Sequence, residues 1–286
     1  MIELQNDALV ASFPDVHPSA RLTIDFQRTL RIPDDGDDYP LPPGLGRFPV
    51  RLVDDFPDTI PPTWLQHGGV MLPMYQSEAM WLNFSPASVR DRCTTYPFAI
   101  KIAAGKINAV TGDNWSEGLR RNPQDYVVAP TQPWLDGFAV EKGLIRQVVA
   151  MPLGAGYSAE EQLTGQGEFG GLQLLIMPMK REVFERRFPE QDKWLRMAGD
   201  GAALYSMAPS AAPESAPDMG LAPGGRMRQE IFDDEFDFDD WDREHVSRCF
   251  VHLTNSLVWR AITGAEPPTV PPTAKRYARA GLPWFD

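Results

Sequence analysis

The sequence predicts a mainly β fold of the α+β type, an antiparallel sandwich or barrel with a few short helices and long proline-rich loops. Short apolar segments recur with glycine or proline between them, at a spacing of about 8–12 residues that is typical of sandwiches and barrels. The chain of 286 residues also contains 28 prolines, about twice the usual share of ~5 %. Each proline costs about 3 kcal/mol inside a helix. Strands this close together cannot hold crossover helices, so we expect antiparallel pairing.

The predicted strands begin with residues 20–32, where Leu22, Ile24 and Phe26 alternate with polar residues in the manner of a half-buried strand. A loop rich in proline and glycine follows over residues 33–46. Residues 70–84 are apolar and fit either a helix face or a strand. Residues 96–110 predict a hairpin that turns at Ala104 and Gly105. Further strands are predicted over residues 125–129, 137–140, 144–151 and 171–177.

One helix is predicted over residues 180–188, with Val183, Phe184 and Phe188 on one face. Residues 198–223 are rich in Ala, Pro, Ser and Gly, which predicts a flexible linker or a long loop. Residues 248–263 fit a strand or a helix. We therefore expect a β-rich main body over residues 1–197 and a C-terminal segment, residues 224–286, that packs on it.

The charge and the cysteine content restrict the class of protein. The formal net charge is −12, from 39 acidic and 27 basic residues, with no run of Lys and Arg. An acidic surface repels phosphate backbones, so nucleic acid and anionic membranes are not expected partners. The two cysteines, Cys93 and Cys249, form no disulfide framework and no Cys-x-x-Cys metal motif. With no leader-like N-terminus and no apolar run near the ~20 residues of a membrane span, we expect a soluble, cytoplasmic protein.

The familiar catalytic and cofactor motifs do not fit the chain. Residues 154–159 match the form G-x-G-x-x-A, but Gly165 and Gly167 would stop the helix that a dinucleotide site requires, and no acidic residue lies near position 176. No cofactor is therefore expected. Neither G-x-S-x-G nor H-E-x-x-H occurs. His252 lies in an apolar stretch and is expected to be a core histidine.

An acidic segment has the spacing of a calcium loop, although its sixth position is Phe238 instead of glycine. Its candidate ligands, at positions 1, 3, 5, 7 and 12 of that pattern, are Asp233, Glu235, Asp237, Asp239 and Glu244. The alternative is a solvated acidic segment that its aromatic side chains hold in place.

Polar side chains set among the short strands between residues 101 and 168 are the candidates for a ligand site. The expected ligand-binding residues are Lys101, Asn108, Gln132, Trp134, Gln147 and Gln162. The catalytic candidates are Lys106, Asp136, Arg146 and Glu168. A charge in mid-strand must find a partner or point outwards. If several of these groups share one concavity, a small charged ligand could be held there. The alternative is simple alternation, with every second residue facing water.

Stretches along nearly the whole chain carry a resemblance to other proteins. They are IDFQRTLRIP at 24–33, LPMYQ at 72–76, GKINAVTG at 105–112, QPWLDG at 132–137, residues 146–156, MGLAPGGR at 219–226 and GLPWF at 281–285. The chain resembles a family of uncharacterised conserved soluble proteins. That resemblance implies that the 286 residues form one unit, and it implies no activity, ligand or catalytic residue.

Three functions follow from these observations as hypotheses. The first is a non-catalytic binding or protein-interaction module whose partner is a small molecule or a protein. The second is an enzyme that acts on a small charged metabolite, with Asp136 or Glu168 as general base and Lys106 or Arg146 stabilising negative charge. The third is a calcium-dependent structural protein. An enzyme predicts a deep pocket with an acid of raised pKa beside a cation, whereas a binding module predicts a shallow aromatic surface.

Overall fold

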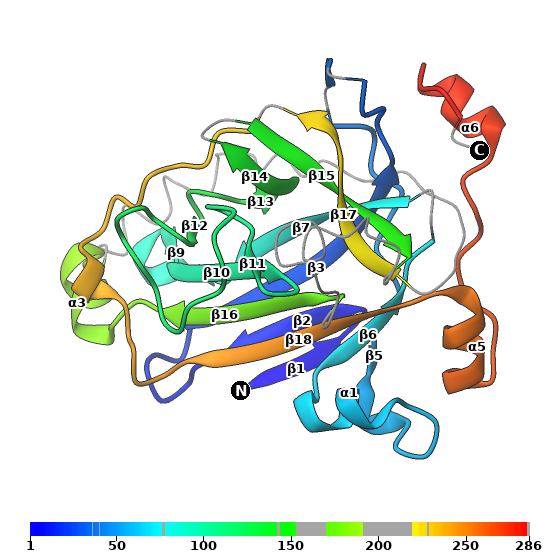
Figure 1. Ribbon diagram of the computed structural model, residues 1–286. Helices are drawn as coiled ribbons and strands as arrows, with labels where there is room; N and C mark the ends of the chain where they lie inside the picture. Colours follow the sequence, from blue (N-terminus) through cyan, green and yellow to red (C-terminus); the bar gives the residue numbers. More distant parts are fainter. Residues whose placement is uncertain are drawn as a thin grey trace.

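The protein is described by a computed structural model over residues 1–35, 37–39, 41–75, 78–141, 144–152, 170–190, 219–227 and 229–284. Two sheets pack face to face, and short helices lie around them (Figure 1). The predicted mainly β sandwich is confirmed, and the sheets do not close into a barrel.

In the described residues the larger sheet has nine strands. They are β1 (Ile2–Gln5), β2 (Ala8–Ser12), β3 (Arg21–Leu30), β4 (Asp38–Tyr39), β7 (Glu78–Pro86), β13 (Trp134–Leu135), β14 (Gly137–Glu141), β15 (Leu144–Pro152) and β17 (Met219–Met227). Their order is β1-β2-β3-β7-β15-β17-β4, with β13 also paired to β7 and β14 to β15. The pairing is antiparallel except between β17 and β4.

The smaller sheet has seven strands within the described ranges. They are β5 (Arg51–Leu52), β6 (Val70–Pro73), β10 (Phe98–Ala104), β11 (Ile107–Asn108), β12 (Val127–Ala129), β16 (Leu172–Pro178) and β18 (Ser247–Thr254). Their order is β11-β10-β16-β18-β6-β5, and β12 pairs with β10. Only β18 and β6 are parallel among these described pairs. A separate two-stranded ribbon joins β8 (Ser88–Val89) and β9 (Thr94–Thr95).

The helices are short and lie around the sheets. They are α1 (Pro62–His67), α3 (Arg181–Arg187), α5 (Ser256–Thr263) and α6 (Ala274–Arg279), with 3-10 turns η1 (Val53–Asp55), η2 (Arg90–Arg92) and η3 (Phe238–Asp240). α5 begins where the Asn255 side chain accepts a hydrogen bond from the Val258 N–H, and it ends at Gly264 in the left-handed conformation. Of the helices that the structure describes, none is long and apolar enough to span a bilayer.

The core lies between the two sheets. Ile24 and Phe26 of β3 meet Phe98 and Ile100 of β10 and Leu174 of β16 in one continuous cluster of buried side chains. Strands from both ends of the chain contribute to this cluster, because β18 lies between β16 and β6. The C-terminal segment therefore shares the core of the main body.

Several predicted elements are confirmed with small shifts at their ends. The hairpin is β10 and β11, in which Ala104 pairs with Ile107 across the turn at Gly105 and Lys106. The predicted helix is α3, which buries Val183 and Phe184. The ambiguous residues 70–84 contain two strands, β6 and β7, and residues 248–263 contain most of β18 followed by α5. Of the predicted linker, residues 198–218 lie outside the described residues and residues 219–223 belong to β17.

The half-buried character predicted for the first strand is wrong in its second half. In β3 every residue from Asp25 to Leu30 is buried. Residues 45–48 lie beside the second half of β3, where β2 no longer pairs with it, with backbone hydrogen bonds from Leu45 to Arg28 and from Phe48 to Phe26 and an antiparallel bridge between Gln27 and Arg47. The polar residues in this half of the strand find partners, and the Asp25 carboxylate lies 3.3 Å from the Arg47 guanidinium.

Candidate functional site

The outer face of the smaller sheet carries a floor of polar and aromatic side chains. Alternation along β18 points Cys249 and Val251 into the core and leaves Arg248 and Phe250 on the opposite face. In the neighbouring strand Gln173 lies directly opposite Phe250. These three side chains therefore lie next to one another on the sheet.

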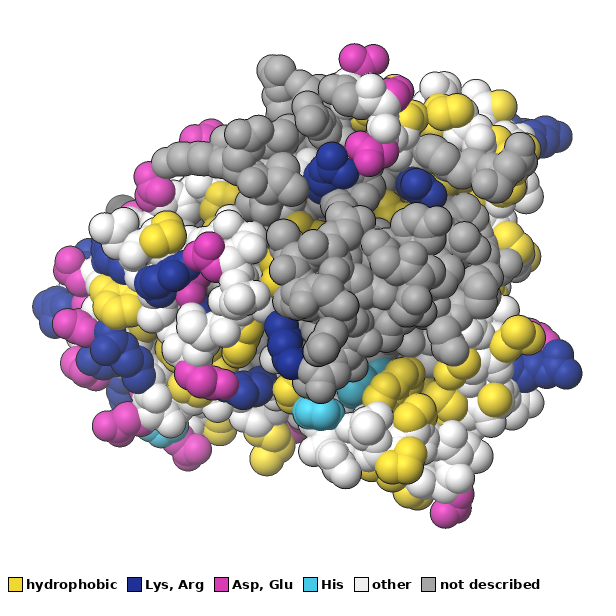
Figure 2. Space-filling model, in the orientation of Figure 1, with side chains coloured by type: hydrophobic (Ala, Val, Ile, Leu, Met, Phe, Trp, Pro, Cys, Tyr) yellow, Lys and Arg dark blue, Asp and Glu magenta, His cyan; other side chains and the backbone are white. Residues whose placement is uncertain are grey.

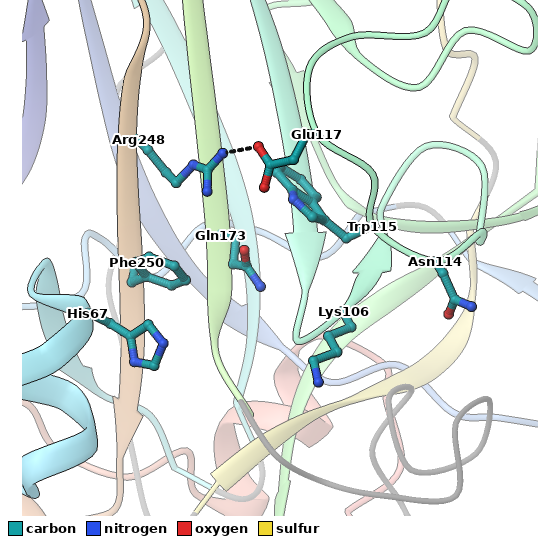
Figure 3. A pocket seen from close by; sticks show the side chains of 8 residues that line it. All are labelled: His67, Lys106, Asn114, Trp115, Glu117, Gln173, Arg248 and Phe250. Carbon is teal, nitrogen blue, oxygen red and sulfur yellow. Dashed lines mark hydrogen bonds and ion pairs between the residues drawn. The ribbon is translucent and has the colours of Figure 1, made fainter.

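Surrounding elements raise walls around this floor and leave a hollow of about 460 Å³. His67, the last residue of α1, stands on one side beside Phe250, and the hairpin turn and the loop of residues 111–118 stand on the other (Figure 3). The residues that line the hollow are His67, Lys106, Asn114, Trp115, Glu117, Gln173, Arg248 and Phe250.

Lys101 holds the loop of the hollow in place. Its ammonium group is fully buried and lies 2.6 Å from the Asp125 carboxylate. It also donates to the carbonyls of Ser116 and Gly118, each at 2.7 Å, and it lies 4.8 Å from the centre of the Trp115 ring. The predicted ligand-binding residue Lys101 is thus engaged beneath the wall of the hollow, where it positions Trp115.

Asn108 and Gln173 fix the two ends of the same wall. The Asn108 side chain donates to the Asp125 carbonyl at 2.8 Å and accepts from the Val110 N–H at 2.8 Å. The Gln173 amide donates to the Gly105 carbonyl at 2.7 Å, which ties the hairpin turn to β16. The expectation that alternate residues simply face water is therefore wrong for Lys101 and Asn108, which are buried and hydrogen-bonded.

An aromatic row runs from the hollow toward α1. The His67 and Phe250 rings lie 4.9 Å apart, and the His252 ring stacks on Trp64 at 4.5 Å. The prediction that His252 is a core histidine is confirmed, because its side chain is buried and its Nε2 lies 3.0 Å from the Gly68 carbonyl. Burial lowers the pKa of His252 to about 4, so the ring is neutral at physiological pH.

The lining of the hollow differs in charge from the rest of the protein. Among its described residues are two cations, Lys106 and Arg248, and one carboxylate, Glu117, in a chain whose net charge is −12. Glu117 and Arg248 form an ion pair at the mouth, with side chains 74 % and 38 % exposed respectively. Figure 2 shows basic, histidine and hydrophobic side chains side by side on the face that carries α1 and β18.

A second group of the predicted residues lies around β13, away from the hollow. The Trp134 indole donates to the Asp136 carboxylate at 3.1 Å, and the Asp136 N–H donates to the Gln229 side chain at 2.9 Å. The Gln132 side chain donates to the Trp134 carbonyl. Burial raises the pKa of Asp136 to about 6, and the hydrogen bond from Trp134 acts in the opposite direction.

The remaining candidates serve other contacts or lie outside the described residues. Gln147 is buried and links β15 to the end of β3, donating to the Leu30 carbonyl at 2.8 Å. Arg146 pairs with Asp34 at 3.1 Å. Gln162 and Glu168 fall outside the described residues. Of the catalytic candidates that the structure describes, Lys106 lines the hollow, whereas Asp136 and Arg146 contact Trp134 and Asp34.

The acidic segment is held by separate partners and has no common point for its carboxylates. Arg187 pairs with Asp237 at 3.0 Å, Arg243 pairs with Asp239 at 2.8 Å, and Glu235 accepts a hydrogen bond from Thr131. Across the described residues, no three His, Cys, Asp or Glu side chains lie close enough together to hold a metal ion. The calcium ligands predicted at Asp233, Glu235, Asp237, Asp239 and Glu244 therefore form no converging set there.

Asp234, which the calcium pattern does not include, is the residue that fixes this segment. It is buried, and its carboxylate accepts hydrogen bonds from the Tyr126 hydroxyl at 2.6 Å and the Trp241 indole at 2.9 Å. These contacts agree with the alternative interpretation, in which aromatic side chains hold the acidic segment in place.

Sequence reasoning missed most of the lining. For Arg248, Phe250 and Gln173 the sequence analysis did not assign the face of the sheet on which each side chain lies, although the alternation of Arg248 and Phe250 with Cys249 and Val251 was a usable signal. No signal pointed to Trp115 or Glu117, which lie in a loop. No family model, curated protein or solved structure matches the chain.

Proposed function

We propose that the protein is a non-catalytic binding module that holds a small anionic molecule with an apolar ring in the hollow on the smaller sheet. The observation that carries the proposal is the meeting of Arg248, Lys106, Phe250 and Trp115 around one hollow. Ligand sites are concavities in which aromatic side chains supply area and a few polar groups fix orientation.

The charges of the lining favour an anion as the ligand. Arg248 presents a planar guanidinium that matches a carboxylate with two parallel hydrogen bonds. The Phe250 and His67 rings offer an apolar surface next to it. A molecule that joins an anionic group to a ring would use both features at once.

The same lining favours binding over catalysis. Its eight described residues include no Ser, Thr or Cys that could act as a nucleophile. Its one carboxylate, Glu117, is paired with Arg248. The His67 Nδ1 lies 2.7 Å from the Thr63 carbonyl and therefore carries the proton, which leaves the lone pair on Nε2, but the described lining offers that nitrogen no hydroxyl or thiol side chain to activate.

We further propose that this binding takes place in the cytoplasm. Cys93 and Cys249 are both free thiols, which fits a reducing compartment. The net charge of −12 makes nucleic acid an unfavourable partner.

A calorimetric titration with ring carboxylates tests the proposed function. Benzoate, phenylacetate and indole-3-acetate serve as probes, and we expect at least one to bind the wild-type protein. Arg248→Gln should weaken that binding at least tenfold, because a hydrogen bond to a charged group contributes about 1.5–3 kcal/mol. Arg260→Gln is the matched control, since Arg260 is an exposed arginine of α5 that pairs with Glu266. Binding that is equally strong in Arg248→Gln, or absent for every probe, would contradict the proposal.

A further inference from the structure

Glu117 stands out from its neighbours in the loop that walls the hollow. The carbonyls of Ser116 and Gly118, on either side of it, are held by the buried Lys101 ammonium. The Glu117 side chain extends into solvent and is 74 % exposed. In the described part of the chain its carboxylate has Arg248 as its ion-pair partner (Figure 3).

The ion pair between Glu117 and Arg248 is weak enough to be exchanged. Both side chains are partly open to water, and exposed pairs of this kind shift an equilibrium constant by about fivefold at most. Opening the pair needs no change in the backbone, because the anchors of the loop are the neighbouring carbonyls. A carboxylate that arrives from solution can therefore take the place of the Glu117 carboxylate on Arg248.

We infer that Glu117 is an internal competitor that occupies the place of the ligand's carboxylate, and that the ligand is a ring-bearing monocarboxylate. The inference rests on the proposed function and names its ligand class. A planar carboxylate fits this place, because the Glu117 carboxylate already occupies it on the Arg248 guanidinium.

The bound molecule has a defined orientation in this arrangement. Its carboxylate lies on the Arg248 guanidinium at the mouth, where Glu117 lies in the free protein. Its ring lies on Phe250 beside His67, whose rings are 4.9 Å apart. The Gln173 amide, between these two groups and the hairpin turn, is committed to the Gly105 carbonyl and keeps the floor in place.

Titrations of Glu117→Gln with each of the three ring carboxylates and the corresponding amides test the inference. Removing the competitor should raise the affinity for the carboxylate by about two- to fivefold and leave the affinity for the neutral amide unchanged. Asp113→Asn is the matched control, because Asp113 lies in the same loop and its exposed carboxylate pairs with Arg120. At 0.15 M salt, where charges are screened beyond about 8 Å, the control should bind like the wild type.

Each outcome bears on one of the two proposals. If no ring carboxylate binds either the wild type or Glu117→Gln, the proposed function itself fails. If a carboxylate binds and Glu117→Gln leaves its affinity unchanged or lowers it, Glu117 is a contributor and not a competitor, and the inference is overturned. An equal gain in carboxylate affinity in Asp113→Asn would show that the effect comes from the net charge of the loop, and this too would overturn the inference. The melting temperatures of both variants show that they are folded.

Discussion

Asp136 illustrates how a single buried residue can influence the stability of this fold. Its side chain is 6 % exposed, and one carboxylate oxygen has no hydrogen-bond partner among the described residues. Burial raises its pKa from 3.8 to about 6, so keeping the charged form inside the protein costs roughly 3 kcal/mol. The group is thus a source of instability at neutral pH.

The first prediction is a pH-dependent gain in stability for Asp136→Asn. Well below pH 3.8 the carboxyl is protonated in both the folded and the unfolded chain and has no such cost. As the pH rises from about 4 to about 6 the unfolded chain loses the proton before the folded one, so over that range this group lowers the free energy of unfolding. The free energy of unfolding of Asp136→Asn, relative to that of the wild type, should therefore increase by roughly 1–3 kcal/mol between pH 4 and pH 7. Urea denaturation at four pH values measures this, and a difference that is constant with pH would contradict it.

The contribution of His252 to the free energy of unfolding changes with pH in the opposite direction over a similar range. Its pKa falls from 6.5 to about 4 on folding. The unfolded chain therefore takes up a proton first as the pH falls below 6.5, and stability is lost in that direction. The contributions of Asp136 and His252 offset each other in the wild type, so Asp136→Asn should reveal a steeper rise of stability with pH.

At the scale of elements, the link between β10 and the loop of the hollow depends on one buried ion pair. Lys101 comes from β10, and Asp125 ends the segment that contains Trp115 and Glu117. Asp125 also accepts the Arg120 N–H at 2.7 Å, so it fixes the loop at two points. The pair is therefore the structural support of the wall.

The second prediction concerns this support. Lys101→Met should lower the free energy of unfolding by about 3–5 kcal/mol, because it leaves the Asp125 carboxylate buried without its partner. The double variant Lys101→Met/Asp125→Asn should recover part of the loss, since it also removes the uncompensated charge. Lys275→Met, at an exposed position of α6, is the control and should change stability by less than about 0.5 kcal/mol. A loss below 1 kcal/mol for Lys101→Met, measured in guanidinium chloride, would show that the pair is not a support.

Elements that depend on local patterns could be predicted from the sequence. The alternation of Leu22, Ile24 and Phe26 gave β3, and the glycine after Ala104 gave the hairpin of β10 and β11. The burial of the polar side chains in the second half of β3 could not be predicted, because their partners, such as Pro42 for Thr29 and Arg47 for Asp25, lie more than ten residues further along the chain. Residues 233–244 have the spacing of a calcium loop, but a spacing does not reveal which partners each carboxylate finds.

At the scale of the whole molecule, the candidate site is assembled from distant parts of the chain. α1, the hairpin with its loop, β16 and β18 each contribute, and the order of the strands brings them to one face. Of the predicted site residues, Lys106 lines the hollow and Lys101 and Asn108 support it. The remaining residues of the lining could not be predicted, because a sequence without sheet order does not show which outward-facing residues become neighbours.

The charge of the molecule gives the site its selectivity in this account. The chain carries −12 overall, whereas the described residues of the lining are two cations and one carboxylate among uncharged side chains and a histidine. Under the proposed function, anions are repelled from the protein as a whole and attracted at this position. Added salt weakens both effects.

The indole signals of the protein report whether the hollow on the smaller sheet holds the ligand. Among the eight tryptophans, Trp115 lines the hollow, and its indole nitrogen is buried with no hydrogen-bond partner among the described residues. Trp134, hydrogen-bonded to Asp136, lies elsewhere. Nitrogen-15 NMR during a titration with indole-3-acetate or benzoate should shift the Trp115 indole signal, identified with Trp115→Phe, and leave that of Trp134 in place. A shift at Trp134 with none at Trp115 would place the ligand outside the hollow and contradict the account.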